Sequence, residues 1–344
     1  MSTSTGFDDV VKKSWRDNRL LVVLLELTYD CNYDCVFCYN DRKLQGRKLD
    51  VDEYGALFHE LADMGVLNLV LSGGEPLVHP HFFAIGALAR ARGFVVRVKS
   101  NGHLLDDATR ARLVHEVDPF LLEVSLHGAT PAVHDRQTRV PGSFAALVAN
   151  LRANQRATGD RLRVRINSTL TKWNEHELDA MYALADELGL PLTVDPDVTP
   201  RDDGDQAPLV LAASDAGLRA LAARHGASIH HEPCGDDVKE SGEKHCGAGS
   251  STLCIDPVGN VYPCVQWRRR VGNVRDGVLS LWRASPVLGE VRALTVDVKR
   301  MVDASGGSAI GFCPGTAESL GGSPLALYSM TARRQDALVQ IKRR

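Results

Sequence analysis

Short apolar runs and longer segments with helical spacing alternate along the first 200 residues. Asp50 with Glu53, and Asn174 with Glu177, have the spacing of a capping box, so we expect helices to begin at both places. Regular alternation of strand and helix is typical of an α/β fold with a parallel sheet. The pattern predicts six strands, at residues 20–28, 66–71, 94–99, 120–126, 162–170 and 192–198.

Six strand–helix units are two fewer than a closed eightfold barrel contains, so we expect a partial (β/α)6 TIM-like barrel with an open side. Functional groups in such barrels lie at the carboxyl ends of the strands. The polar segment 201–206 marks the end of the barrel, and a turn at 257–260 predicts a later β-hairpin. We therefore expect four parts, namely an N-terminal segment (1–19), the barrel (20–205), a linker with a helix (206–245) and a small C-terminal domain (246–344).

Composition narrows the choice of partners and location. The chain has 344 residues, of which 44% are hydrophobic and 24% charged, and its formal net charge is -3. These values are typical of a folded globular protein and predict no attraction to nucleic acid. No apolar run approaches the ~20 residues that span a bilayer, and residues 1–19 are too polar for a secretion signal. We expect a cytoplasmic protein that binds neither nucleic acid nor membrane.

Three of the eight cysteines, Cys31, Cys35 and Cys38, lie within eight residues directly after the first predicted strand. Thiolates on one short loop are the usual ligands of a four-iron cluster, and three of them leave one iron open to a small molecule. A structural zinc site normally has four ligands, and nothing near this loop supplies the fourth. A disulfide framework suits a small secreted domain, but no apolar signal stretch precedes the first strand. The spacing therefore favours an iron–sulfur cluster in a reducing compartment.

The spacing Cys31-x3-Cys35-x2-Cys38 resembles the signature of the radical S-adenosylmethionine (SAM) enzymes. Gly73-Gly74-Glu75-Pro76, after the second predicted strand, resembles the Gly-Gly-Glu-Pro motif of the same family. The resemblance implies that the open iron of a [4Fe-4S] cluster chelates SAM through its amino and carboxylate groups. It also implies that an electron from the cluster cleaves SAM to a 5'-deoxyadenosyl radical, which abstracts hydrogen from a substrate. In such enzymes the cofactor supplies the difficult chemistry and the protein positions it.

The resemblance further implies where the chain contacts SAM. From the residues alone, packing explains Phe37 equally well, a turn explains Ser100 and Asn101, and a solvated charge explains Arg139. The implied contacts are Phe37 near adenine, Gly73, Gly74 and Glu75 near the amino group, Ser100, Asn101 and Ser125 near the ribose and carboxylate, Arg139 paired with the carboxylate, and Asn167 and Leu170 near adenine.

A second cysteine region begins at Cys246. The pattern Cys246-x12-Gly259-x4-Cys264 resembles the opening of the SPASM domain, an auxiliary iron–sulfur module of radical SAM enzymes. A full SPASM domain has seven cysteines for two clusters, whereas here only Cys313 follows. We therefore expect one shortened, twitch-like auxiliary [4Fe-4S] cluster held by Cys246, Cys264, Cys313 and a fourth donor. Cys254 or Cys234 is the candidate donor, and if neither binds, the cluster has an open iron.

These features predict a radical SAM enzyme that cross-links a ribosomally made peptide or alters one of its side chains. We expect flavodoxin or ferredoxin as the reductant and, because the barrel begins near residue 20, a separate peptide-carrier protein. Two alternatives stay open: oxidation or rearrangement of a small metabolite such as a sugar, aminoglycoside or tetrapyrrole, and a non-catalytic iron–sulfur electron carrier or regulatory protein. Asp195 and Asp197, ending the sixth strand, are candidate acid–base groups, although loop carboxylates are usually solvated.

Overall fold

The computed structural model of the chain describes residues 6–41, 43–158, 161–225, 244–305 and 311–342. All six strands expected in the first 200 residues are present, and each pairs in parallel with its sequence neighbour. Their bounds differ from the predicted ones by a few residues at most. They are β1 (Val22–Thr28), β2 (Asn68–Gly73), β3 (Val95–Ser100), β4 (Leu121–Ser125), β5 (Val164–Thr169) and β6 (Leu192–Asp195).

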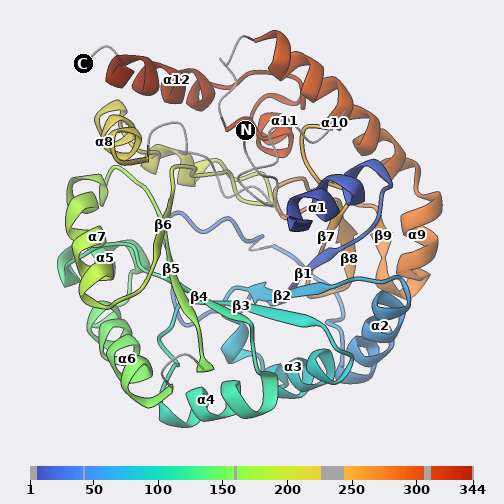
Figure 1. Cartoon of the computed structure of the whole chain (residues 1–344), viewed down its shortest axis with the longest axis horizontal. Coiled ribbons are helices and arrows are strands. Elements are labelled where there is room, and N and C mark those ends of the chain that lie inside the picture. Colours follow the sequence, from blue (N-terminus) through green and yellow to red (C-terminus); the bar gives the residue numbers. More distant parts are fainter. Residues whose placement is uncertain (1–5, 42, 159–160, 226–243, 306–310, 343–344) are drawn as a thin grey trace.

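Helices form a layer outside the curved sheet (Figure 1). Phe58 and Leu61 of the first connecting helix belong to one buried apolar cluster with Leu69 and Leu71 of β2, and burial of this kind drives the packing of helices on the sheet. The longer helices are α1 (Gly6–Arg16), α2 (Val51–Asp63), α3 (Phe82–Ala91), α4 (Asp107–Arg112), α5 (Pro131–Thr138), α6 (Ser143–Thr158), α7 (Leu178–Glu187), α8 (Asp215–His225), α9 (Val278–Ala284), α10 (Pro286–Ala304), α11 (Pro314–Gly321) and α12 (Ser329–Lys342). Short helical turns are η1 (Pro76–Val78), η2 (Leu113–Val117), η4 (Glu175–Glu177), η5 (Ala207–Leu211) and η7 (Val274–Asp276).

The sheet continues beyond the barrel strands. Its order is β6-β5-β4-β3-β2-β1-β7-β8-β9, with β7 (Thr252–Ile255), β8 (Asn260–Tyr262) and β9 (Gly272–Asn273). The expected hairpin is therefore confirmed, since β7 and β8 pair antiparallel around residues 256–259. However, β7 also pairs in parallel with β1, with Cys254 opposite Leu24. The hairpin thus satisfies the backbone groups on the open edge of β1, and the described strands end at β6 and β9 without closing a ring.

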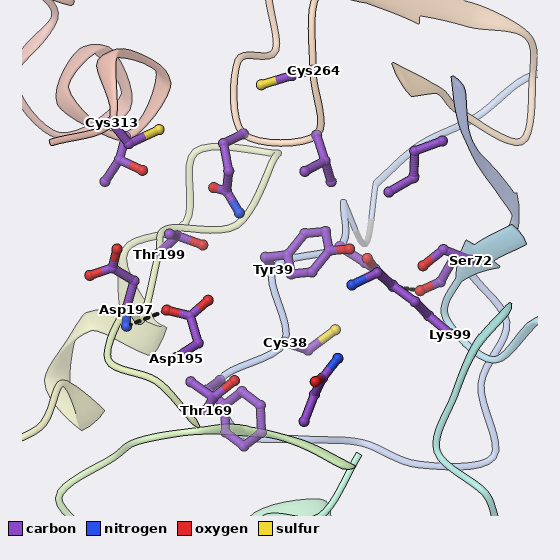
Figure 2. Close-up of a pocket in the computed structure, with 18 of the residues that line it drawn as sticks. Cys38, Tyr39, Ser72, Lys99, Thr169, Asp195, Asp197, Thr199, Cys264 and Cys313 are labelled. Carbon is purple, nitrogen blue, oxygen red and sulfur yellow. Dashed lines mark hydrogen bonds between the residues drawn. The ribbon is translucent and has the colours of Figure 1, made fainter. Parts of the chain in front are cut away.

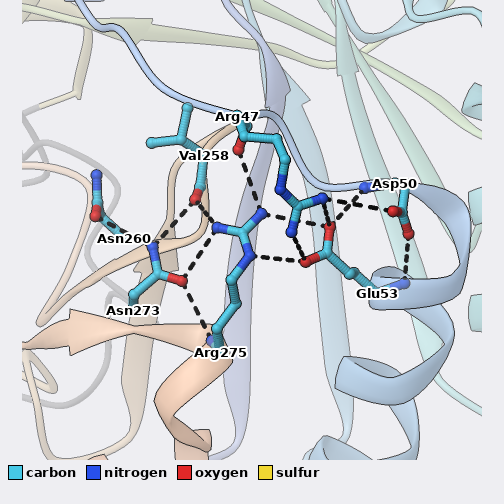
Figure 3. A network of polar contacts seen from close by, with 7 residues as sticks. All are labelled: Arg47, Asp50, Glu53, Val258, Asn260, Asn273 and Arg275. Atoms are coloured by element: carbon cyan, nitrogen blue, oxygen red, sulfur yellow. Dashed lines mark hydrogen bonds and ion pairs between the residues drawn. The ribbon is translucent and has the colours of Figure 1, made fainter.

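The capping box predicted at the start of α2 is confirmed and is also a docking point. The Asp50 carboxylate accepts from Glu53 N at 2.9 Å, and Asp50 N donates to the Glu53 carboxylate at 3.0 Å. Arg275, just after β9, donates both to Glu53 and to the carbonyl of Val258 (Figure 3). Hydrogen bonds from Arg275 and then Arg47 lower the pKa of Glu53 to about 2. The cap of α2 therefore ties the C-terminal hairpin to the barrel.

The second predicted capping box, at Asn174 and Glu177, is wrong. Asn174 Oδ1 accepts instead from Thr171 N at 2.7 Å. The Glu177 carboxylate accepts from Ala129 N at 2.7 Å and from Thr130 Oγ1 at 2.6 Å. Because Asn174 is engaged by Thr171 and Glu177 by residues 129–130, neither side chain caps the helix; residues 175–177 form a short 3-10 turn, and α7 begins only at Leu178.

Candidate active site

One cavity of about 1280 Å³ opens at the carboxyl ends of the barrel strands. Figure 2 shows Cys38, Cys264 and Cys313 around the same space, so the two cysteine regions share it. Among the predicted site residues, those that line the cavity are Cys31, Cys35, Cys38, Phe37, Gly73, Gly74, Ser100, Asn101, Ser125, Asn167, Asp195, Asp197, Cys246, Cys264 and Cys313.

The glycine pair of the Gly-Gly-Glu-Pro segment packs against the start of the cysteine loop. Gly74 N donates to Thr28 O at 2.6 Å. A Cβ at Gly73 would lie 2.2 Å from Thr28 O, and one at Gly74 would lie 2.5 Å from Asp30 O. Only glycine permits this approach, because any side chain would collide with the backbone that leads to Cys31. The pair therefore fixes where the loop leaves β1.

Glu75 supports the cavity from beneath and does not line it. Its carboxylate is fully buried and accepts from Asn101 N at 2.6 Å, Ser100 Oγ at 2.9 Å and Leu77 N at 3.0 Å. Burial raises the pKa of Glu75 to about 7, in opposition to these hydrogen bonds. Asn101 in turn donates to Asn32 Oδ1 at 2.7 Å, so Glu75 braces the cysteine loop through the end of β3.

Polar side chains from three neighbouring strands meet on the inner face of the barrel. Ser125 is opposite Asn167, Asn167 is opposite Thr193, and Thr169 is opposite Asp195. All five line the cavity. Thr169 and Thr193 were missed by the sequence reasoning, although the two-residue period of a strand places them on the same face as Asn167 and Asp195.

Phe37 lies in the cavity wall against a residue that the sequence reasoning also missed. The ring centroids of Phe37 and His127 are 4.6 Å apart, and the ring planes meet at 69°. His127 also lines the cavity. The only sequence signal for it is its place two residues after Ser125, at the end of β4. This edge-to-face contact holds Phe37 in one orientation beside the cysteine loop.

Two further predicted SAM contacts lie outside the cavity wall. Arg139 is exposed and pairs with Asp34 at 2.9 Å. Leu170 is fully buried in an apolar cluster that includes Leu178 and Met181. The neighbours Ser168 and Thr169 reach the cavity in place of Leu170. The roles of Arg139 and Leu170 toward SAM stay predictions.

Three cysteines of the C-terminal region, Cys246, Cys264 and Cys313, line the same cavity. Gly249 N donates to Pro263 O at 3.0 Å, which brings the chain after Cys246 alongside the residue before Cys264. Cys313 directly precedes α11, and a Cβ at Gly315 in that helix would lie 2.4 Å from Gln266 O. The close approach at Gly315 holds Cys313 beside the loop that follows Cys264.

Cys254 differs from these three. It is fully buried in β7, does not line the cavity and accepts a hydrogen bond from Arg268 at 3.5 Å. Burial raises the pKa of its thiol well above the usual value. Cys234, the other candidate for the fourth ligand, lies outside the described residues.

A buried charge network connects the two cysteine regions. Arg268 donates to both oxygens of the Glu26 carboxylate, at 2.8 and 3.0 Å, and pairs with Asp202 at 2.6 Å. Asp202 N donates to the carbonyl of Tyr39 at 2.8 Å, directly after Cys38. Burial raises the pKa of Asp202 to about 7, although the Arg268 charge opposes the shift. Arg268 thus joins the chain after Cys264 to β1 and to the end of the first cysteine loop.

The donor set of the first loop fits an iron–sulfur cluster. Cys31 Sγ accepts hydrogen bonds from Tyr33 N at 3.3 Å and Asn101 Nδ2 at 3.9 Å. Bonds to sulfur of this kind tune cluster potentials. Burial raises the pKa of Cys31 to about 11, so ligation has to displace its proton. Among the described residues, no three His, Cys, Asp or Glu side chains lie close enough together to bind one metal ion. A four-iron cluster does not need such a group, because each thiolate binds a different iron.

Comparison with known families matches residues 25–185 to the radical SAM superfamily and residues 246–303 to SPASM, an iron–sulfur cluster-binding domain. Mycofactocin maturase MftC of Mycobacterium ulcerans is 32% identical over 285 residues, which cover 78% of this chain and 75% of that one. An AdoMet-dependent heme synthase of Methanosarcina barkeri is 28% identical over 298 residues, covering 79% and 84%. The chain therefore belongs to the radical SAM superfamily and carries a SPASM domain. Its cofactors are SAM, the [4Fe-4S] cluster that binds SAM, and the iron–sulfur cofactor of the SPASM domain.

Solved structures agree with the fold. SuiB of Streptococcus suis bound to SAM has a TM-score of 0.71 at 15% identity, over 94% of this chain and 80% of that one. The same protein bound to its precursor peptide SuiA has a TM-score of 0.64 at 14% identity, over 83% and 70%. The partial barrel with a C-terminal SPASM domain is thus confirmed. No helix among the described residues is both long and apolar enough to cross a bilayer.

Proposed function

We propose that this radical SAM enzyme acts on a ribosomally synthesised peptide, which it cross-links or alters at a side chain. The observation that carries the proposal is that one continuous cavity of about 1280 Å³ reaches from the first cysteine loop to the SPASM cysteines. A peptide segment in this cavity would meet both cofactor sites. The relatives support this reading, because MftC is named as a maturase and the SuiB fold binds a precursor peptide.

In this proposal the residues of the first loop and its supports have separate tasks. When bound, the cluster and SAM supply the 5'-deoxyadenosyl radical that abstracts a hydrogen atom. Cys31, Cys35 and Cys38 hold the cluster and leave one iron for SAM. The backbone of Gly73 and Gly74 lines the adjacent wall and offers carbonyl oxygens to an ammonium group. Glu75 acts indirectly, by fixing the end of β3.

We further propose that Cys246, Cys264 and Cys313 hold one auxiliary cluster. They are the cysteines of the described C-terminal region that line the cavity, whereas Cys254 is buried beside Arg268. Three thiolates would leave the fourth position of this cluster facing the cavity. The substrate or another donor would then complete it.

A second candidate function is the conversion of a tetrapyrrole. The M. barkeri heme synthase favours it, because the alignment covers 84% of that enzyme. The same cavity and clusters would serve this reaction. The two candidates therefore differ in substrate and share the SAM chemistry.

The test is anaerobic incubation of the holoprotein with SAM, reduced flavodoxin or ferredoxin, and either peptides encoded beside the gene or iron-coproporphyrin, followed by mass spectrometry. We expect 5'-deoxyadenosine together with a peptide that has lost two hydrogen atoms or carries an altered side chain. Turnover of the tetrapyrrole alone would favour the second candidate. Failure to cleave SAM would favour a non-catalytic carrier. If the free peptide does not react, we propose that a separate carrier protein presents it. We also propose the reducing cytoplasm as the location of the enzyme.

A further inference from the structure

Lys99, near the end of β3, differs from the other lysines of the cavity wall. The ammonium groups of Lys48, Lys244 and Lys299 each donate hydrogen bonds to described residues at 2.5–3.0 Å. The Lys99 ammonium makes no hydrogen bond within the described part of the chain, and its ion pair with Glu123 spans 3.4 Å. The Lys99 side chain is 43% exposed and reaches into the cavity (Figure 2). Its N–H donors are therefore open to a bound molecule.

Glu123 does not depend on Lys99 for charge compensation. It is buried in β4, and its carboxylate accepts from Arg97 at 2.6 Å. Burial opposes ionisation of Glu123, yet the charges of Lys99 and Arg97 lower its pKa. Arg97 and Lys99 share one face of β3, and Arg165 of β5 is opposite Glu123 in the sheet register. One carboxylate thus lies among three basic residues, so this part of the inner barrel face has a net positive charge.

A hydroxyl lies beside Lys99 on the neighbouring strand. Ser72 and Lys99 directly follow Leu71 and Val98, which are opposite each other in β2 and β3. Both Ser72 and Lys99 line the cavity (Figure 2). Among the described residues, Ser72 Oγ has no hydrogen-bond partner. An ammonium and a hydroxyl on adjacent strands can donate to the two oxygens of one carboxylate.

The candidate acid–base carboxylates lie away from Lys99. Asp195 ends β6 and Asp197 lies just beyond it, and two strands separate β3 from β6 in the sheet. Asp197 is already paired with Arg334. An anionic group that enters the cavity is therefore attracted to the wall at β3.

The position of Lys99 is also close to the first cysteine loop. Asn101 donates to Cys31 Sγ at 3.9 Å. Lys99 precedes Asn101 by two residues on the same strand, a separation of about 7 Å along β3. A group held by Lys99 therefore stays near the site where the radical forms.

We propose that Lys99 binds a carboxylate of the substrate, with Ser72 as a second donor, and so selects an anionic substrate. The inference rests on the proposed function and specifies the substrate class of the same cavity. In a peptide the group is an Asp or Glu side chain or the C-terminal carboxylate, and in a tetrapyrrole it is a propionate. The carboxylate of SAM is engaged at the open iron in the family's binding mode, which leaves Lys99 to the second molecule.

The test measures probe binding to the iron-loaded, unreduced protein with SAM present, by titration calorimetry. The probes are the peptide encoded beside the gene and iron-coproporphyrin, each compared with a form whose carboxyl groups are converted to amides. We expect Lys99→Gln to bind the probe that wild type turns over about tenfold or more weakly, the effect of one charged hydrogen bond. The amidated probe should bind wild type as weakly and should not respond to the substitution. Lys99→Arg keeps the charge and should stay within about threefold of wild type.

The controls separate the possible failures. Lys299→Gln removes a cavity lysine whose ammonium already bonds to Asp303, and it should bind the probe as wild type does. Iron content is measured for every variant, and Lys99→Met carries the test if the Gln protein loses its iron.

Wild-type affinity for the probe in Lys99→Gln would overturn the role of Lys99 and leave the proposed function intact. An equal loss in Lys299→Gln would also overturn it. Weaker SAM binding with unchanged probe binding would overturn it as well, because the carboxylate at Lys99 would then be that of SAM. Absence of SAM cleavage, or of product from both probes, in the wild-type protein would overturn the proposed function itself.

Discussion

Arg334 of α12 forms an ion pair with Asp197, just beyond β6, and both side chains are buried. Arg334 also donates to the carbonyl of Gly311 at 2.8 Å. Asp197 lines the cavity, and its backbone N–H donates to Asp195 Oδ1 at 2.9 Å. The C-terminal helix thus holds the part of the wall that carries both candidate acid–base groups.

Removal of Arg334 should leave a buried carboxylate without its charge partner. We expect Arg334→Met to lower the free energy of unfolding by about 3–5 kcal/mol. The double variant Arg334→Met/Asp197→Asn should recover part of that loss, because it no longer buries an unpaired charge. Urea unfolding of the four proteins measures the coupling. Strictly additive losses would show that the two groups do not depend on each other.

Glu75 should be needed for the shape of the cavity although it does not line it. Glu75→Ala removes the acceptor for three donors, from Leu77, Ser100 and Asn101. We expect a loss of about 3 kcal/mol or more in unfolding free energy, since each orphaned buried donor costs about 1–3 kcal/mol. Glu75→Gln keeps one acceptor oxygen and should lose less. Hydrogen exchange at the Asn101 amide offers a local readout, and unchanged protection in the Ala protein would contradict the bracing role.

Iron counting tests the assignment of the cysteines. Cys31→Ala and Cys246→Ala should each lose about four irons per chain, because each removes a ligand of a different four-iron cluster. Cys254→Ser should keep the wild-type iron content, because Cys254 lies in β7 away from the cavity. Loss of about four irons in Cys254→Ser would make that cysteine the fourth ligand of the auxiliary cluster.

The buried histidine pair should make the fold sensitive to acid. Burial lowers the pKa of His134 to about 4, so below the unfolded-state value of about 6.5 the unfolded chain takes up a proton that the folded chain does not. The resulting stability is present above pH 6.5 and is lost as the pH falls toward 4. Between pH 7.5 and 5.5 the loss is about 1.4 kcal/mol for this residue. His134→Gln should reduce the pH dependence of urea unfolding by about that amount, and an unchanged dependence would refute the assignment.

The strands could be predicted from local patterns, because each apolar run occupies consecutive residues. The short spacing of Cys31, Cys35 and Cys38 likewise placed these cysteines on one loop after β1, where they line the cavity. Thr193 and Asn167 come together only through the register between β5 and β6, although their alternation along each strand hints at one shared face. The pairing of β7 with β1 joins residues more than 200 positions apart, and the apolar run 252–255 does not say which edge it will join.

The misread capping box has a similar cause. Asn174 and Glu177 have the correct spacing, but their side chains bond to Thr171 and Ala129. The Asn174 side chain bonds locally to Thr171, and Glu177 is held by the loop after β4, so the two side chains cannot form the capping box. The sequence did not indicate His127 either, because its ring contacts Phe37 and His134, which lie in two other segments of the chain.

The most direct measurement is the EPR spectrum of the reduced, iron-loaded protein before and after addition of SAM, with 5'-deoxyadenosine quantified in the same sample. The account predicts a changed cluster signal and release of 5'-deoxyadenosine in the wild-type and Cys246→Ala proteins, and neither in Cys31→Ala. An unchanged signal without 5'-deoxyadenosine, in wild-type protein that holds its full iron, would contradict it.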